Sequence, residues 1–301
     1  MRIVSMVPSA TEIVCALGLA DHIIAISHDC DYPAEILDRP RLTATELGSE
    51  LSSYEIDEKV RASAASGQSL YAINRELLQR LNPDLVLTQE QCSVCAVDRD
   101  RAVCTLEDAN LHADWLSLAA SDFEGLFQDV LKIGSATARR RQAESLVRRL
   151  ASRLEGIAQQ TAVTLRPRVF CLSWFDPLMT AGSWISEMVR LAGGEDRLGA
   201  GGVSSSKITT DRLLTELPQV IFLLPCSFSQ SRTAREWVTI RDSDPWMDLP
   251  AVREGRAFAL ESSLFHRPGP RLVEGVELMA SLLHPDRFSL PAQSELSRRV
   301  A

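Results

Sequence analysis

RELLQRLNPDLVLTQ (residues 75–89) and DRLLTELPQVIFLLP (residues 211–225) follow one plan. Each begins as an amphipathic helical segment, meets a proline (Pro83 or Pro218) that breaks the helix, and continues into an apolar strand. A helix-to-strand unit that recurs about half a chain apart predicts two similar lobes. Two facing lobes form a cleft, so we expect the function to lie in a cleft between them.

Length and composition permit this two-lobed organisation. Domains average roughly 100 to 200 residues, so a chain of 301 residues can form two α/β lobes that each bury a core. Hydrophobic residues make up 45% and charged residues 24% of the chain, which is typical of a globular protein. We therefore expect the whole chain to fold.

Charge and hydropathy argue against two kinds of partner. The formal net charge is −8, and no stripe of Lys and Arg interleaved with aromatic residues is present, so nucleic-acid binding is not expected. The densest basic run, Arg139–Arg141, is interpreted as the solvated face of a helix. No segment reaches the roughly 18 to 20 apolar residues of a membrane span, so the chain is not expected to span a membrane.

The N-terminal segment and the cysteines bear on the compartment. The segment MRIVSMVPSATEIVCALGLA is interrupted by Pro8, Ser9 and Glu12, which is unlike an export signal. Seven cysteines, an odd number, do not form the disulfide framework of a small secreted protein. As written, the chain is expected to be cytoplasmic, and periplasmic or surface-anchored if a signal was trimmed.

The predicted strands end in loops that carry polar, aromatic or cysteine residues. In α/β sheets ligands usually bind beyond the carboxyl ends of the strands. We predict a helix at 70–81 and strands at 2–7, 22–27, 85–88, 168–172 and 220–224. The loops that follow four of these strands are HDCDYP (28–33), QEQCSVCAVD (89–98), the segment from Trp174 onward, and PCSFS (225–229).

A long helical pattern connects the two predicted lobes. Capping boxes at Ser9/Glu12 and Ser121/Glu124 predict two helix starts. The second pattern is interrupted at Gly134-Ser135, and a helix over 136–160 would be about 37 Å long at 1.5 Å per residue. We interpret it as a rigid strut. The predicted domains are an N-terminal α/β lobe at 1–121, a connecting backbone helix at 122–165 and a C-terminal α/β lobe at 166–301.

Five motifs along essentially the whole chain carry a resemblance to a known family. They are VPSATEIVCALGL, PDLVLTQ, MVRLAGGED, W...LPAVREGRAFAL and RPGPRLVEGVELMA. In this order they resemble the class III, or helical-backbone, substrate-binding proteins of ABC importers, which bind cobalamin, siderophores, haem or metal ions. The cobalamin-binding-protein-like subgroup is the most similar. The resemblance implies two similar α/β lobes with central, mainly parallel sheets, joined by a long backbone helix, with the ligand cleft between the lobes.

The resemblance also implies which residues line that cleft. The turn that matches Pro8, Ser9 and Thr11 lines it in relatives, as do aromatic residues at the positions of Trp174 and Trp184. Large flat rings suit a large flat ligand such as a corrinoid. The alternative is that both tryptophans are core residues.

Two loops supply further candidates for ligand binding. Tyr32 lies in the HDCDYP loop, and His266 and Arg267 lie in FHRPGP, which the resemblance brings to the cleft mouth. A neutral imidazole at His266 or His28 suits the cobalt of a corrinoid or a bare metal ion, with hydrogen-bonded structure as the alternative. Arg267 suits a phosphate or carboxylate on the ligand.

The loop cysteines support a second hypothesis. Cys30, Cys92, Cys95 and Cys226 all fall just beyond predicted strand ends. Four thiolates would suit zinc or an iron–sulfur cluster. A disulfide pair and plain burial are the alternatives. The second hypothesis is therefore a cytoplasmic metal- or iron–sulfur-binding protein on the same scaffold, and a regulatory or partner-binding module is the third.

Partners and catalysis complete the expectations. In transporters of this family an acidic residue on each lobe docks onto the permease, and Glu76 with Glu187 or Glu195 are the candidates here, solvated surface being the alternative. The chain has no G-x-S-x-G elbow, Walker A motif, H-E-x-x-H or G-x-G-x-x-G fingerprint, so it is not expected to be an enzyme. The leading hypothesis is a binding protein for a corrinoid or a similar metal chelate.

Overall fold

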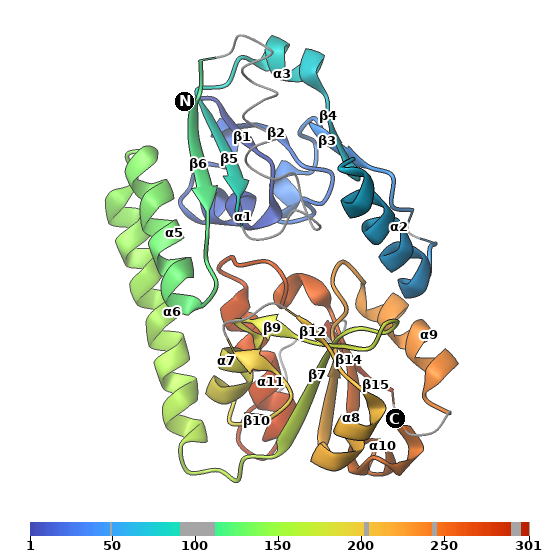
Figure 1. The fold of residues 1–301 in the computed structure, drawn as a ribbon. Helices are drawn as coiled ribbons and strands as arrows, with labels where there is room; N and C mark the ends of the chain where they lie inside the picture. Colours follow the sequence, from blue (N-terminus) through green and yellow to red (C-terminus); the bar gives the residue numbers. More distant parts are fainter. Residues whose placement is uncertain (49, 91–111, 202–204, 243–245, 290–295, 301) are drawn as a thin grey trace. The chain divides into compact units, whose positions relative to one another are not determined.

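The computed structural model describes residues 1–48, 50–90, 112–201, 205–242, 246–289 and 296–300. The chain divides into two units, which the ribbon diagram shows with their sheets and helices (Figure 1). Unit 1 comprises residues 1–51, 58–149 and 268–270, and unit 2 comprises residues 52–57, 150–267 and 271–301. The predicted domain boundaries at 121 and 165, and the cleft between the lobes, stay predictions.

The sheet of unit 1 has four parallel strands in the order β2-β1-β5-β6. They are β1 (Ile3–Ser5), β2 (Ile23–Ile26), β5 (Leu85–Gln89) and β6 (Asp114–Leu118). The central strands β1 and β5 are buried along their whole length, as expected for a parallel sheet with both faces covered. Because the strands are parallel, the loops that follow them meet at one edge of the sheet.

The remaining elements of unit 1 include a short antiparallel pair. They are α1 (Pro8–Ala16), η1 (Ala20–His22), η2 (Ala34–Ile36), β3 (Thr43–Thr45), α2 (Ser53–Ser66, which begins in unit 2), β4 (Tyr71–Ile73), α3 (Arg75–Leu81) and α5 (Phe123–Ala136). The helix predicted at 70–81 is wrong in its first part, because Tyr71–Ile73 pairs with β3 as β4. Helix α3 then begins after Asn74, whose side chain accepts a hydrogen bond from the Leu77 amide at 2.9 Å.

The main sheet of unit 2 is mixed, in the order β12-β8-β7-β13-β14-β15, with β10 also pairing with β7. Strands β7, β10, β13 and β14 are parallel, whereas β8, β12 and β15 are antiparallel to their neighbours. The strands are β7 (Arg168–Trp174), β8 (Met179–Thr180), β10 (Glu195–Asp196), β12 (Ser206–Lys207), β13 (Val220–Leu223), β14 (Ala257–Leu260) and β15 (Ser297–Arg299); β9 (Gly182–Ser183) pairs separately with β11 (Ala200–Gly201).

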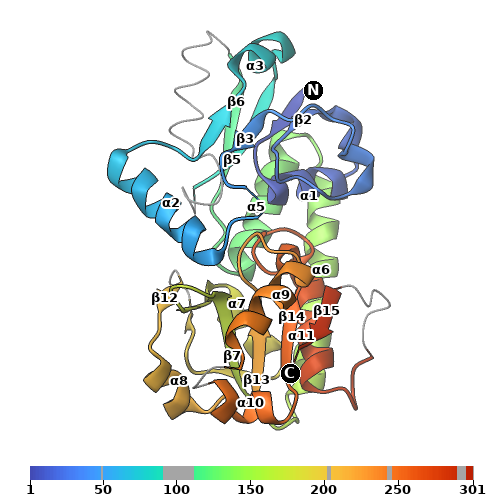
Figure 2. The same ribbon diagram turned by 90° about the vertical axis from the view of Figure 1, so that its right-hand side faces the viewer.

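Helices cover this sheet and complete a core of aromatic and aliphatic side chains. Helices α7 and α11 pack against each other, while α9 and α10 pack against β14 and β13 (Figure 2). Phe170, Ile221 and Trp237 are fully buried members of this core. The helices are α7 (Ile185–Leu191), α8 (Thr210–Glu216), α9 (Gln230–Ile240), α10 (Pro250–Arg253), α11 (Leu272–Leu283), and the 3-10 turns η3 (Trp246–Asp248) and η4 (Ser262–Leu264).

The long helical pattern forms two helices. Helix α5 ends at Ala136 and α6 runs from Arg140 to Thr161. The chain turns between them at Ala138, which has a left-handed φ of 56°. The predicted interruption at Gly134-Ser135 therefore lies a few residues too early. Helix α6 contributes residues 140–149 to unit 1 and 150–161 to unit 2, and its 22 residues are about 33 Å long at 1.5 Å per residue.

Both predicted capping boxes are wrong about the cap residue. The N-cap of α1 is Val7 and Pro8 is the first helical residue, because the fixed φ of proline suits that position. The N-cap of α5 is Asp122, whose side chain accepts a hydrogen bond from the Gly125 amide at 2.7 Å. The N-cap of α1 therefore lies two residues before the serine of the Ser-x-x-Glu pattern, and the N-cap of α5 lies one residue after it.

The repeated sequence unit is also a repeated structural unit. Asn74 and Thr209 are the N-caps of α3 and α8. Their C-caps are Asn82 and Leu217, which have left-handed φ values of 40° and 46°. The offset is 135 residues both from 74 to 209 and from 82 to 217. This is one residue less than the offset between the quoted stretches. With the offset of 135 residues that the caps give, Glu76 in the first repeat corresponds to Asp211 in the second.

An arginine at the start of one strand in each unit completes the repeat. Arg2, next to β1, donates through Nε and Nη2 to the Leu81 carbonyl at 3.0 and 2.7 Å. Arg168, which begins β7, donates to the Glu216 and Leu217 carbonyls at 3.0 and 3.1 Å. Both arginines satisfy carbonyls that the end of a helix leaves unpaired. The predicted fold class, two similar α/β lobes with mainly parallel sheets, is confirmed.

Candidate functional site

The turn from β1 to α1 is fastened to the loop after β2 by buried polar groups. The Thr11 hydroxyl donates to Ser5 Oγ at 2.8 Å, and Cys30 Sγ lies 3.1 Å from both Thr11 Oγ1 and Ser27 Oγ. Thr11 is 0% and Ser9 2% exposed, whereas Pro8 is half-buried. Of the residues predicted in this turn, Thr11 holds the turn in place, Ser9 is buried and Pro8 is half-buried.

The loop after β2 presents an aromatic side chain at the same edge of the sheet. Arg41 Nη1 donates to the Ser27 carbonyl at 3.0 Å and also to the Cys30 carbonyl, which fixes the path of this loop. Tyr32 follows and is 45% exposed. His28 is held inside the loop, with Nδ1 2.7 Å from Thr43 Oγ1. Tyr32 is therefore the exposed side chain of this loop, whereas His28 is half-buried.

Trp174, the last residue of β7, lies in an aromatic layer of unit 2. Its ring centroid is 5.3 Å from that of Phe228, and the Arg232 guanidinium lies 3.5 Å from the centroid of the Phe228 ring. The Trp174 indole Nε1 donates to the Ser53 carbonyl at 3.1 Å. Trp174 remains half-buried, so it combines a fixed orientation with an accessible ring surface.

Ser53 belongs to the first turn of α2, which is bound within unit 2. The Ser53 amide donates to Glu236 Oε1 at 3.1 Å, and its hydroxyl donates to the same oxygen. Ile56, three residues further on, packs against the core of unit 2. The first turn of α2 therefore lies beside the predicted ligand residue Trp174, a neighbour that the sequence does not indicate.

The loop after β14 brings His266 to the end of β13. His266 Nε2 lies 2.5 Å from the carbonyl of Leu224, the residue that follows β13. His266 and Arg267 are half-buried. Trp184 is only 8% exposed, and its Nε1 donates to the Phe265 carbonyl at 2.6 Å. Trp184 therefore supports this loop from the core, whereas His266 and Arg267 lie at the surface of the carboxyl edge.

The cysteines do not assemble a metal centre in the part of the chain that the structure describes. Cys92 and Cys95 lie outside the described residues. Cys30 belongs to unit 1 and Cys226 to unit 2, and no group of three or more His, Cys, Asp or Glu among the described residues could hold a metal ion. The zinc or iron–sulfur hypothesis therefore gains no support.

Two other cysteines, the half-buried Cys15 and the buried Cys171, have thiols with raised pKa values. Burial, with a smaller contribution from Glu35, raises the pKa of the Cys15 thiol to about 12. Burial also raises the pKa of Cys171 well above its ordinary value. Because the thiolate is the form that binds metals, both side chains behave as small apolar groups at neutral pH.

The acidic candidates differ in their surroundings. Glu76 is exposed in the first turn of α3. Glu187 Oε1 lies 3.7 Å from Arg190 Nη2, and Glu195 Oε2 lies 3.0 Å from Arg197 Nη2. The repeat instead matches Glu76 with Asp211, which is exposed in the first turn of α8. Asp211 was not among the sequence-based candidates, which came from the resemblance and not from the repeat.

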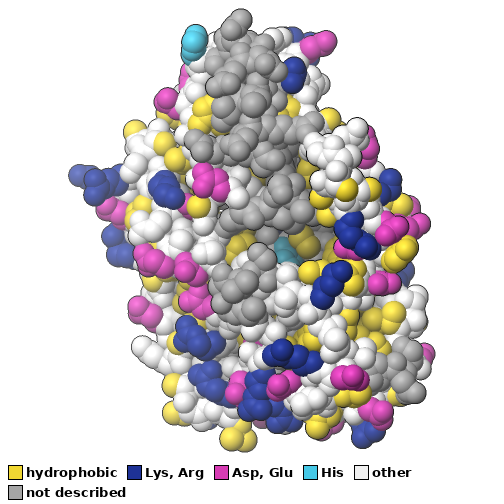
Figure 3. Space-filling model, in the orientation of Figure 1, with side chains coloured by type: hydrophobic (Ala, Val, Ile, Leu, Met, Phe, Trp, Pro, Cys, Tyr) yellow, Lys and Arg dark blue, Asp and Glu magenta, His cyan; other side chains and the backbone are white. Residues whose placement is uncertain are grey.

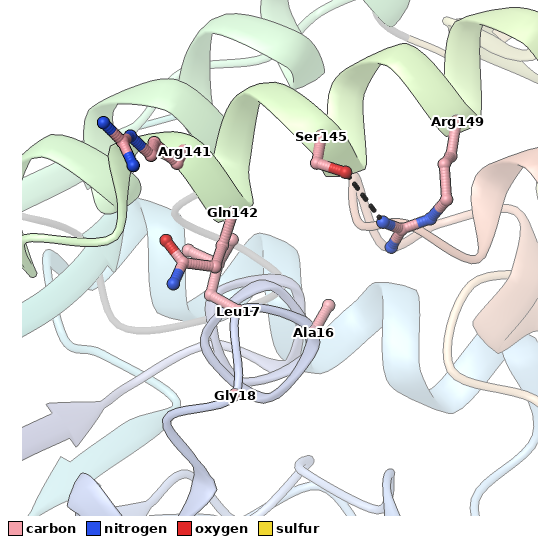
Figure 4. A pocket seen from close by; sticks show the side chains of 7 residues that line it. All are labelled: Ala16, Leu17, Gly18, Arg141, Gln142, Ser145 and Arg149. Carbon is pink, nitrogen blue, oxygen red and sulfur yellow. Dashed lines mark hydrogen bonds between the residues drawn. The ribbon is translucent and has the colours of Figure 1, made fainter.

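A surface cavity of about 520 Å³ lies at the other end of α1. The C-terminal end of α1, at Leu17 and Gly18, faces side chains of α6 that include Arg141 and Arg149 (Figure 4). Ser145 Oγ accepts a hydrogen bond from Arg149 at 3.3 Å. None of the predicted ligand residues lines this cavity, and it has no aromatic ring in its wall.

The surface carries charges of both signs. Figure 3 shows Lys and Arg side chains interspersed with Asp and Glu over the face that it draws. Among the residues that the structure describes, no helix combines the length and the apolarity that a membrane crossing requires.

Comparison with known proteins gives a family match over most of the chain. The model of a family described as "Periplasmic binding protein" matches residues 3–264. A Bacillus subtilis protein named uncharacterized ABC transporter substrate-binding lipoprotein YvrC is 26% identical, over 95% of this chain and 81% of its own length. A vitamin B12-binding protein of Vibrio cholerae is 24% identical, over 94% of this chain and 88% of its own length.

Solved structures share the fold. The periplasmic vitamin B12 binding protein BtuF of Vibrio cholerae matches with a TM-score of 0.67 and 22% identity, over 94% of this chain and 96% of that one. A periplasmic heme binding protein from Pseudomonas aeruginosa matches with a TM-score of 0.75 and 19% identity, over 100% of this chain and 98% of that one. At these identities the likeness establishes the architecture alone.

Proposed function

The chain belongs to the periplasmic binding protein family, and we propose that it binds a corrinoid or a related metal tetrapyrrole as the substrate-binding protein of an ABC importer. The observation that carries this proposal is the similarity, over 94% of the chain, to a protein named for binding vitamin B12. The similarity to an ABC transporter substrate-binding lipoprotein supports the importer role.

The side chains at the carboxyl edges of the sheets have the chemistry that such a ligand requires. Tyr32 in unit 1 and Trp174 in unit 2 offer flat rings with accessible surface, which suit a planar macrocycle. Arg267 offers a guanidinium for the carboxylate or phosphate groups that tetrapyrroles carry. In this proposal Pro8 completes the edge, while Thr11 and Trp184 keep their neighbours in position.

The relatives also bear on where the protein acts. They include a lipoprotein and periplasmic proteins, so we place this chain outside the cytoplasm. The cytoplasmic expectation from the sequence is not supported. The permease would meet the first turns of α3 and α8, where the exposed carboxylates of Glu76 and Asp211 occupy equivalent positions.

Equilibrium titration with cyanocobalamin, aquacobalamin and hemin, each followed by absorbance and by calorimetry, tests this function. We expect at least one of the three to bind. Because truncation of an aromatic hot spot costs about 2 kcal/mol, Tyr32→Ala and Trp174→Ala should each weaken binding roughly 30-fold. Arg141→Ala, in the cavity beside α1, is the control and should bind like the wild type. No binding of any of the three up to roughly millimolar would refute the proposal.

A further inference from the structure

The ring of Trp174 is oriented by a single hydrogen bond. The Phe228 ring packs beside it, with a centroid distance of 5.3 Å and an interplanar angle of 57°. Packing of this kind leaves the indole two orientations, which differ by rotation about the Cβ–Cγ bond. The indole Nε1 only donates, and it donates to the Ser53 carbonyl at 3.1 Å. This bond therefore selects one of the two orientations.

The Ser53 peptide is held in turn by Glu236 of α9. Glu236 Oε1 accepts from the Ser53 amide at 3.1 Å and also from the Ser53 hydroxyl. Hydrogen bonds to a carboxylate are roughly twice as strong as neutral ones. Ser53 is 3% exposed, so water competes little for either bond. Ser53, Trp174 and Glu236 all belong to unit 2, so the contacts that lead from Glu236 to the Trp174 ring lie within one unit.

Helix α2 has its own means of starting, independent of Glu236. Glu55 Oε2 accepts from the Ser52 amide at 2.7 Å, and Ser52 Oγ accepts from the Glu55 amide at 3.3 Å. This reciprocal pair is a capping box, which satisfies main-chain groups at the start of a helix. Ser53 is the buried residue of α2, and Ile56 packs against the core of unit 2. The bonds from Ser53 to Glu236 therefore place a helix start that is already closed.

We propose that Glu236 is a positioning residue for the bound tetrapyrrole and acts through the Ser53 carbonyl on the ring of Trp174. This inference rests on the proposed function, in which Trp174 offers a flat surface to the macrocycle. In this role Glu236 does not touch the ligand. Without the carboxylate, the Ser53 peptide loses both of its bonds to α9, and its carbonyl no longer holds the indole in one orientation. The ring must then be ordered on binding, which lowers the affinity.

Titration of the full-length protein with cyanocobalamin, aquacobalamin and hemin tests the effect on binding. Glu236→Ala should weaken binding of the probe that the wild type binds by roughly tenfold, the order expected for a lost charge-assisted hydrogen bond. Trp174→Phe lacks the indole N–H, so in that background Glu236→Ala should weaken binding by less than about twofold. Glu236→Gln keeps Oε1 as an acceptor and should recover most of the affinity. The control Glu58→Gln removes a carboxylate from an exposed ion pair on α2 and should bind like the wild type.

Tryptophan fluorescence without ligand tests the orientation of the ring directly. The emission of Trp174 is the difference between a protein and the same protein with Trp174→Phe. In Glu236→Ala we expect this difference spectrum to shift in wavelength and to be quenched more readily by acrylamide. In Glu58→Gln it should match the wild type. A variant that had only lost stability would keep the wild-type spectrum while it is folded.

The outcomes separate the inference from the proposed function. The positioning role is refuted, while the binding function stands, if the wild type binds a probe and Glu236→Ala binds it equally well. Equal losses in the wild-type and Trp174→Phe backgrounds, or an unchanged Trp174 difference spectrum, also refute it. If the wild type binds none of the three probes, the proposed function fails, and the fluorescence still decides whether Glu236 orients Trp174. Circular dichroism checks folding, and Glu236→Met, which keeps the length of the side chain without an oxygen acceptor, replaces Glu236→Ala if the alanine variant does not fold.

Discussion

Gly193 stands where the ends of three helices meet, and no other residue type fits there. It follows α7 with a φ of 84°. A Cβ at this position would lie 2.8 Å from Thr161 Cβ, at the end of α6, and 2.5 Å from Nε2 of His284, just after α11. Both the backbone conformation and the close packing therefore require glycine.

We expect Gly193→Ala to lower the free energy of unfolding by about 2 to 4 kcal/mol, because it adds an overpacking cost to the left-handed strain. The matched control is Gly67→Ala, at a φ of 67° with open space around the added Cβ. This control carries the strain alone and should cost about 1 to 2 kcal/mol. Urea unfolding measures both variants, and equal losses would contradict the packing argument.

His284 makes stability depend on pH. Burial lowers its pKa below the ordinary 6.5, although the Gly193 carbonyl and the Ala192 main chain act in the opposite direction. A lowered pKa in the folded state means that the stabilisation is present above pH 6.5 and is lost as the pH falls through the folded-state pKa. The unfolding temperature of the wild type should therefore decline between pH 7.5 and pH 5.5 more steeply than that of His284→Gln. Parallel curves would rule out His284 as the titrating group.

At the scale of elements, the sequence pattern predicts the buried strands, but contacts with distant segments determine the secondary structure elsewhere. The strands β1, β2, β5, β7 and β13 were predicted from short apolar runs, because buried parallel strands are apolar on both faces. Helix α2 was not predicted, since only Ser53 among its residues is buried and it has no apolar stripe. Residues 71–73 were predicted as helix, but pairing with β3 makes them a strand.

We expect the Glu236 carboxylate to stabilise the first turn of α2 through its hydrogen bonds from Ser53. Ser53→Ala removes the hydroxyl that donates to Glu236 and should lower the free energy of unfolding by about 1 kcal/mol. Glu58→Gln, on the same helix, breaks only an exposed ion pair with Arg61 and should change it by less than about 0.5 kcal/mol. Thermal unfolding of the two variants compares them directly. A loss for Glu58→Gln as large as that for Ser53→Ala would contradict the assignment.

At the scale of the whole molecule, the duplication made the fold predictable. The helix-to-strand segment that occurs twice in the sequence indicated two similar lobes. In the structure, Arg2 and Arg168 also occupy equivalent places, each donating to a carbonyl at the end of the repeated helix. The candidate site was less accessible from sequence. Its contacts join residues that are distant in the chain. Trp184 donates to the Phe265 carbonyl, His266 is hydrogen-bonded to the Leu224 carbonyl, and Trp174 donates to the Ser53 carbonyl.

The duplication also predicts how the protein meets its permease. In proteoliposomes that carry the permease, the double variant Glu76→Ala/Asp211→Ala should lower ligand uptake by roughly tenfold or more, while its affinity for the ligand in solution stays unchanged. A close charge pair across an interface is worth about 1.5 kcal/mol or more, hence the magnitude. The double variant Glu187→Ala/Glu195→Ala is the control. Loss of uptake in the control alone would restore the original assignment.

The indole of Trp174 gives the protein an optical reporter of its own. Trp184, Trp237 and Trp246 are buried, and Trp115 is half-buried in β6. Trp174, which is half-buried and whose N–H donates to the Ser53 carbonyl, emits from the edge where the ligand is proposed to arrive. Metal tetrapyrroles absorb where tryptophan emits. Occupancy can therefore be followed by quenching of intrinsic fluorescence in the unlabelled protein, with Trp174→Phe as the dark reference.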